Sequence, residues 1–199
     1  MPEREPEQVV EEFVPTSGKV TGVIGLLIAA GVVVVGLVDR EQGFPPVVIG
    51  IALLAGALIW ATMLRPRMWA TGEHLVMRNA LSTTRIPLAA IEQIAVRQVV
   101  SVRAGERRYV SPAVGKSWRQ SLLASRGRAR TTAQGSTPYP VFVEERLHQL
   151  ADDARRDAGV APLSDEQLAL AAGVRREWAW PEIAALAAGA LVVVVAVVV

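Results

Sequence analysis

The residues of this chain that are most suited to binding a ligand are its basic residues, because of their number. They are suited to binding rather than to catalysis. Between residues 65 and 137, thirteen Arg and Lys stand against three Glu, a net charge of +10, whereas the whole chain carries +2. Guanidinium and ammonium groups bind phosphates and carboxylates, and near an anionic bilayer each basic residue gains about 1 kcal/mol. The candidate ligand-binding residues are therefore Arg65, Arg67, Lys116, Arg119, Arg126, Arg128 and Arg130.

Two other roles for this charge have to be weighed. Arginines beside an apolar segment can simply orient it in a membrane, as Arg65 and Arg67 would in either case. Nucleic acid also attracts positive charge, but single-strand binding normally adds stacked aromatic side chains, for which only Tyr109, Trp118 and Tyr139 are candidates. We therefore expect lipid or protein partners and no nucleic acid.

The sequence gives little support to metal or catalytic chemistry. The chain has no Cys, which excludes thiolate nucleophiles and Cys-ligated zinc, and His74 and His148 are too few and too far apart for a metal cluster. Gly115-Lys116-Ser117 resembles the end of a phosphate-binding loop, but Val110 stands where its first glycine is required. We expect no enzyme, metal or cofactor, unless folding brings polar groups together in a cleft.

Two apolar runs, Val20 to Val38 and Val47 to Leu64, organise the first third of the chain. Each is 18 or 19 residues long and uncharged, and a helix of that length spans roughly 27 to 29 Å, about one hydrocarbon core. A backbone in lipid must satisfy its own hydrogen bonds, so helices are expected despite the many Val residues. The sequence therefore predicts a transmembrane hairpin over residues 20–64; core helices of a soluble protein are the alternative.

A third apolar run, Ile183 to Val199, is just long enough to span, which predicts a third transmembrane helix over residues 182–199. Arg65 and Arg67 follow the second run, and basic flanks favour the cytoplasm. We expect a cell-membrane protein whose N-terminus and middle domain are cytoplasmic and whose C-terminus is outside, with Trp60 and Trp69 as interfacial anchors.

Small residues recur within the first two runs at the spacing that lets helices approach closely. Gly18 and Gly22 form one such pair, and Ala52 and Gly56 form another. We expect these pairs to pack the hairpin against itself, although they could also bind a separate subunit.

From residue 72 the pattern changes to short alternating segments. Strands are predicted at 74–78, 81–86, 91–103 and 107–110, with turn residues between them. Val143, Leu147 and Ala151 recur at helical spacing within an amphipathic helix over 142–158, which Gly159 would end. Residues 112–140, rich in Ser, Gly and Arg, are expected to form a basic loop.

The remaining segments are shorter. Residues 1–19 are acidic and contain three Pro, so we expect a disordered tail. Residues 161–181 form a linker with a short helix starting at Asp165, because Ser164 and Gln167 have the spacing of a capping box. Leu163 and Leu168 would add a hydrophobic staple.

The segments Trp69 to Leu81, Arg85-Ile86-Pro87 and Arg107 to Pro112 resemble the bacterial PH-like (pleckstrin-homology-like) domain of small actinobacterial membrane proteins, where this domain follows a transmembrane hairpin. The resemblance implies a seven-stranded barrel capped by a helix, here the one at 142–158. Since only four strands are predicted, residues 112–140 either supply further weak strands or depart from the pattern of the family. Its motif is structural and implies no catalytic or ligand residues.

Together these observations predict an α+β membrane protein. It would consist of the hairpin (20–38 and 47–64), a cytoplasmic PH-like domain at 65–160 made of antiparallel strands and a capping helix, and a C-terminal transmembrane helix. The expected function is non-enzymatic binding of a protein partner or anionic lipid headgroups. The alternative is an accessory subunit that assembles with other membrane proteins through its transmembrane helices.

Overall fold

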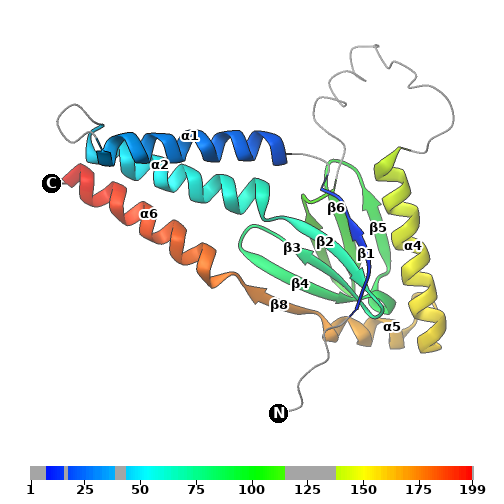
Figure 1. Ribbon diagram of the computed structural model, residues 1–199. Coiled ribbons are helices and arrows are strands. Elements are labelled where there is room, and N and C mark those ends of the chain that lie inside the picture. Colours follow the sequence, from blue (N-terminus) through cyan, green and yellow to red (C-terminus); the bar gives the residue numbers. More distant parts are fainter. Residues whose placement is uncertain (1–7, 16–17, 39–43, 115–137, 199) are drawn as a thin grey trace. The chain divides into compact units, whose positions relative to one another are not determined.

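The computed structural model describes residues 8–15, 18–38, 44–114 and 138–198 (Figure 1). The chain forms two compact units that alternate along the sequence. One, here called the β module, comprises residues 1–17, 67–78 and 83–177, and the other, the helical unit, comprises residues 18–66, 79–82 and 178–199.

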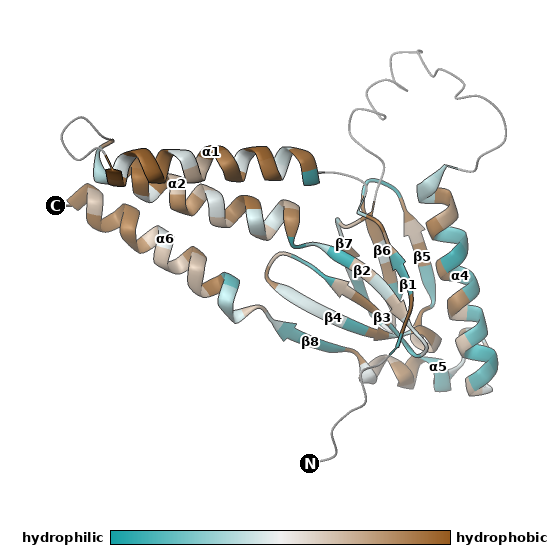
Figure 2. Ribbon diagram, viewed as in Figure 1, coloured by the Kyte–Doolittle hydropathy of each residue, from teal (hydrophilic) through white to brown (hydrophobic). Residues whose placement is uncertain are grey.

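The helical unit contains three helices that are long and apolar enough to cross a membrane. They are α1 (Lys19–Val38), α2 (Pro46–Ile59) with its π-helical continuation η1 (Trp60–Leu64), and α6 (Trp180–Val198). All three are apolar along their lengths (Figure 2). The predicted helical state is thus confirmed despite the Val-rich sequences, and α6 begins earlier than the predicted third run.

Glycines bring the helices of this unit together. A Cβ on Gly36 of α1 would lie 2.7 Å from the Ile49 side chain of α2, and one on Gly189 of α6 would lie 3.2 Å from the Leu54 Cα of α2. Gly22 faces Met63, and Gly56 faces Ala29 of α1 at ordinary contact distance. The small residues at 22 and 56 therefore pack the hairpin against itself, as predicted, and α2 also contacts α6.

The β module contains two antiparallel sheets. The strands of the first lie in the order β1-β2-β3-β4-β8, and those of the second in the order β5-β6-β7. Their bounds are β1 Val9–Phe13, β2 Arg67–Thr71, β3 His74–Arg78, β4 Ser82–Pro87, β5 Gln93–Val96, β6 Val100–Ala104, β7 Arg107–Ser111 and β8 Arg175–Trp178. Helices α4 (Tyr139–Ala158) and α5 (Asp165–Leu170) and the 3₁₀ turns η2 (Leu88–Ala90) and η3 (Ala171–Gly173) complete the module.

Helix α4 supplies the apolar stripe that the sequence predicted. Val143, Leu147 and Ala151 are each at most 1% exposed and join the core formed by both sheets, whereas the other side of the helix is polar (Figure 2). The helix ends at Gly159, whose φ of +66° is readily adopted by a residue without a Cβ. These features confirm the expected cap.

The predicted strand over 91–103 is wrong, because residues 97–99 form a turn between β5 and β6. Val96 lies opposite Val100, and the Arg97 N–H donates to the Val99 carbonyl at 3.1 Å. The same apolar alternation is present on both sides of the turn, since Ile94, Val96, Val100 and Val102 are all buried. Polar Gln98, which is exposed, interrupts that alternation and marks the turn.

The expectation of a disordered N-terminal tail is also wrong for residues 9–13, which form β1 and pair with β2. Phe13 is 1% exposed and belongs to the core. Glu11 accepts a hydrogen bond from Arg146 of α4 at 2.6 Å, and the Val14 N–H donates to the Tyr139 hydroxyl at 2.7 Å. Burial raises the pKa of Tyr139 above its ordinary value.

Helix α5 shows the predicted N-cap but no staple. The Ser164 side chain accepts from the Gln167 N–H, while Leu163 and Leu168 are 74% and 44% exposed. Gln167 is instead turned inward and 1% exposed. Its amide accepts from the Leu163 N–H and donates to the Ala89 and Ile91 carbonyls, and so joins α5 to η2 and the start of β5.

This amide yields a first prediction. Gln167→Leu should destabilise the protein by about 2 kcal/mol, because the buried Ala89 carbonyl loses its donor. Gln167→Glu should destabilise it more, because a carboxylate would face two carbonyl oxygens. Thermal unfolding in detergent, followed by circular dichroism, measures both, with exposed Gln149→Leu as the control. Equal stability of Gln167→Glu and the parent would contradict this role.

Candidate functional site

The outer face of the β5-β6-β7 sheet carries a basic hollow. Cross-strand pairing places Gln93, Arg103 and Arg108 in one row, and Ala95, Ser101 and Val110 in another row of the same face. The cavity above them measures about 930 Å³. Its lining includes the guanidinium groups of Arg97, Arg103, Arg107 and Arg108 and a single acid, Glu106.

Two of these arginines are held in place by the protein. Arg108 donates to the Ser101 hydroxyl, which fixes its guanidinium over the middle of the sheet. Arg103 donates from Nε to the Gly105 carbonyl at 3.3 Å, and the same nitrogen lies 3.7 Å from Glu92. Gly105 takes a φ of +59° in the β6–β7 turn. The turn therefore positions the Arg103 side chain, and Ser101 of β6 positions that of Arg108.

The other two arginines have no such support. Neither Arg97 nor Arg107 makes a side-chain hydrogen bond or ion pair with any residue in the described part of the chain, and both are exposed. Clustered guanidinium groups repel one another, so an anion that binds among them gains attraction and relieves that repulsion. The arrangement can bind an anion, and it contains no nucleophile with an adjacent base.

The residues predicted from sequence lie elsewhere. Arg67 is exposed at the start of β2, and Trp69, expected at the interface, lies in β2 opposite Val76. Lys116, Arg119, Arg126, Arg128 and Arg130 fall outside the described residues.

Arg65, the remaining predicted residue, forms a buried ion pair in the helical unit. Its Nε donates to Glu182 at 2.5 Å, its Nη1 donates to the Asn79 carbonyl, and its side chain is 5% exposed. The π-helical turn of η1 places it there, since the Arg65 N–H bonds to the Trp60 carbonyl five residues back. This arginine is thus engaged within the protein rather than open to a ligand.

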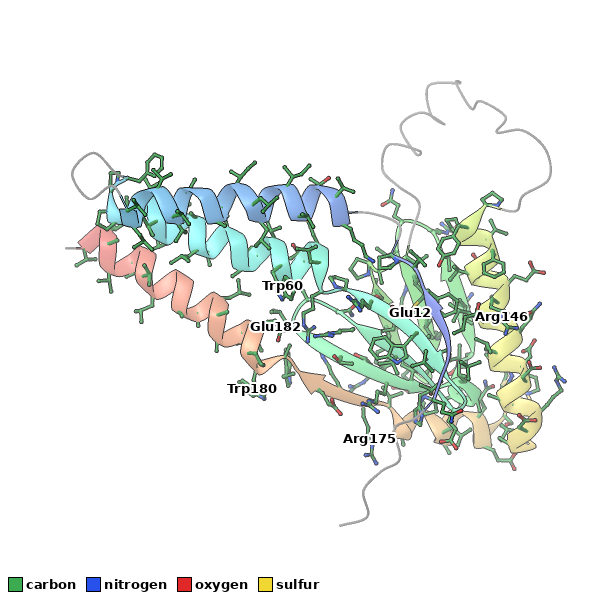
Figure 3. The ribbon with its side chains drawn as sticks, viewed as in Figure 1. Glu12, Trp60, Arg146, Arg175, Trp180 and Glu182 are labelled. Atoms are coloured by element: carbon green, nitrogen blue, oxygen red, sulfur yellow. The ribbon has the colours of Figure 1, made fainter. Side chains whose placement is uncertain are left out.

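Exposed aromatic side chains and an apolar cavity surround this ion pair. Trp60 and Trp180 are 50% and 70% exposed and lie with Glu182 at one end of the three helices (Figure 3). A cavity of about 360 Å³ opens beside them, lined also by Leu26, Gly56, Ala57, Pro181 and Ala185. Amphipathic Trp side chains are typical of the membrane–water interface.

The hollow was missed because its arginines are scattered in sequence. Arg103 and Arg108 flank the predicted turn at 104–106, and hairpin pairing around that turn would have placed them side by side. Arg97 could be placed only once the turn at 97–99 was recognised. In the described residues, no group of three or more His, Asp or Glu could hold a metal.

Comparisons with protein-family models, with curated proteins and with solved structures found no match to this chain.

Proposed function

We propose that this protein is a three-span membrane protein that holds a PH-like module on the cytoplasmic face and binds anionic ligands with it, without catalysis. The basic hollow on the β5-β6-β7 sheet carries the proposal, because four arginines line it and two of them have no side-chain partner among the described residues. The ligand would be an acidic partner protein or an anionic lipid headgroup.

The strand order supports a PH-like module. Four strands, β1 to β4, pair consecutively, three more form the second sheet, and α4 follows them in sequence and packs into the core. This arrangement agrees with the seven strands and capping helix that the resemblance implies. It differs in that α1 and α2 separate β1 from β2, and β8 extends the first sheet.

The pairing of β1 with β2 supports the hairpin topology. β1 precedes α1 and β2 follows η1, yet the two strands are hydrogen-bonded neighbours. Strands that pair must lie on the same side of a bilayer, so an even number of crossings must separate them. The basic flanks at Arg65 and Arg67 favour the cytoplasm for that side.

Because the chain has no Cys, its topology can be tested with single cysteines. We expect Glu145→Cys, on exposed α4, to react with a membrane-impermeant maleimide in inverted vesicles and not in intact cells. Phe44→Cys, just before α2, should show the opposite pattern. Labelling of Glu145→Cys in intact cells would place the module outside and overturn this part of the proposal.

Ligand binding can be tested with the full-length protein in neutral phosphatidylcholine nanodiscs. Anionic vesicles that contain phosphatidylglycerol should co-float with the discs, and Arg97→Glu/Arg107→Glu should weaken capture at least tenfold, since each basic contact is worth about 1 kcal/mol. Arg156→Glu/Arg175→Glu, which makes the same charge change on exposed positions outside the hollow, is the matched control. Equal loss in both variants would show that net charge, not the hollow, drives binding.

The alternative, an accessory subunit that assembles through its helices, has less support. Gly22, Gly36, Gly50, Gly56 and Gly189 all contact neighbouring helices of the same unit. The close-approach positions are thus used within the chain, and of the glycines in α1, α2 and α6 only Gly31 has no neighbour within 4 Å among the described residues. A stoichiometric partner in detergent pull-downs would favour this alternative.

A further inference from the structure

Arg97 and Arg107, which have no side-chain partner in the described part of the chain, lie at opposite ends of the basic hollow. Arg97 belongs to the β5–β6 turn, whereas Arg107 begins β7 next to the β6–β7 turn. Four rows of paired residues, from Val96–Val100 to Gln93–Arg103, separate the two turns. Arg97 lies one step before the first of these rows and Arg107, opposite Ala104, one step after the last. Five steps of about 3.3 Å put the backbones of the two arginines roughly 16 Å apart along the strands.

One small anion cannot use both ends well. To meet at a single phosphate, Arg97 and Arg107 would both have to extend fully toward the middle of the sheet. Arg108 already occupies that middle, where it is held by Ser101. A volume of about 930 Å³ also exceeds what one phosphate fills. The geometry therefore favours a ligand with two separated anionic groups.

The cations of the hollow indicate the nature of those groups. All four are arginines. The planar guanidinium presents paired N–H donors that match phosphate oxygens, and a phosphoryl group offers more charge and more acceptors than a carboxylate. Arg103, in the row of Gln93, can complete one phosphate site with Arg107, and Arg97 can form the other, with the guanidinium of Arg108 between the two sites.

Resting on the anion-binding function proposed above, we propose that the hollow binds a ligand with two phosphoryl groups on a short spacer, one held at each end. Such a ligand could be a diphosphate phospholipid such as cardiolipin, or a soluble bisphosphate. A membrane source would have the advantage of concentration, because only residues 65–66 separate η1 from β2 and tether the module close to lipid.

The test compares the binding of ligands that carry two phosphate groups with the binding of ligands that carry one. Full-length protein in phosphatidylcholine nanodiscs is mixed with vesicles containing cardiolipin or phosphatidylglycerol at equal lipid-phosphate charge, and capture is measured by co-flotation. Calorimetry compares fructose 1,6-bisphosphate with inorganic phosphate and with a heptaglutamate peptide. Arg97→Gln and Arg107→Gln are measured singly, with Arg175→Gln as the control, and thermal melts confirm that each variant is folded.

We expect at least a tenfold preference for the two-phosphate probe in one of the two arms, because the second contact is intramolecular. Arg97→Gln and Arg107→Gln should each reduce the affinity for the two-phosphate probe to that for the one-phosphate probe. Arg175→Gln should retain the preference for the two-phosphate probe. Preference in the vesicle arm alone identifies a lipid source, and preference in calorimetry identifies a soluble one. Equal binding of one-phosphate and two-phosphate probes, or equal affinity for heptaglutamate, would overturn the inference.

The two proposals fail differently. If vesicles are captured through Arg97 and Arg107 but cardiolipin has no advantage, anion binding stands and the two-phosphate ligand is refuted. If no anionic probe binds the parent protein, both proposals fail.

Discussion

Arg65→Met should destabilise the protein by about 3 to 5 kcal/mol, because the Glu182 carboxylate, whose side chain is 14% exposed, loses the ion pair with the Arg65 guanidinium at 2.5 Å. The Asn79 carbonyl loses a donor at the same time. Thermal unfolding in detergent measures the loss, and the fluorescence of Trp60 and Trp180, which lie at this end of the helices, reports it locally (Figure 3).

Two controls distinguish the loss of the Arg65–Glu182 ion pair from the effect of removing any positive charge nearby. Arg67→Met removes an arginine two residues away that is exposed, and we expect a change within about 0.5 kcal/mol. Arg65→Met/Glu182→Gln should recover part of the loss, because the uncompensated charge is gone. If the double variant is no more stable than Arg65→Met, the pair does not account for the effect.

Phe13→Ala should cost about 3 to 5 kcal/mol, since it empties a fully buried aromatic site in the core of the β module. The loss should also free β1 from β2, so limited proteolysis should cut near residue 13 faster than in the parent. Thermal unfolding and the cleavage rate are the two readouts.

The control is Val10→Ala in the same strand, where the side chain is 56% exposed and little change is expected. Were Phe13→Ala as stable as Val10→Ala, residues 9–13 would not belong to the module, and the expectation of a disordered tail would be restored.

Sequence patterns were sufficient to predict those elements of the fold whose stabilising interactions are local in the chain. The lengths of the apolar runs identified the three long apolar helices of the described residues, because length and lack of charge are properties of the segment itself. The strand at 74–78 was predicted with its observed bounds, and Gly159 ends α4 as expected. Each of these features depends on residues close together in the chain.

The missed features depend on partners far apart in sequence. β1 contains two adjacent Glu and exposed Val residues, and it becomes a strand because β2, more than fifty residues later, pairs with it. β8 is only four residues long and fully exposed, and it adds to the edge at β4. Such segments have no hydrophobic pattern of their own, and tertiary contacts decide their state.

The dependence on distant partners also explains why the basic hollow was not predicted from the sequence. Arg65 was expected to bind a ligand because of its position after an apolar run, but Glu182, more than a hundred residues away, takes up its charge. The arginines of the basic hollow converge only through the register of two hairpins. Charge counting selected residues 65–137, which include the four arginines of the hollow, but it could not select the face on which they lie.

The separation of β1 from β2 has a consequence for biogenesis. In the membrane topology proposed above, the first strand leaves the ribosome well before its neighbour and waits, unpaired, while the hairpin enters the bilayer. The strand β8 is synthesised after α4 and α5 and directly before α6. A product truncated before β8 would therefore leave the edge of the first sheet at β4 unpaired and open to quality-control proteases.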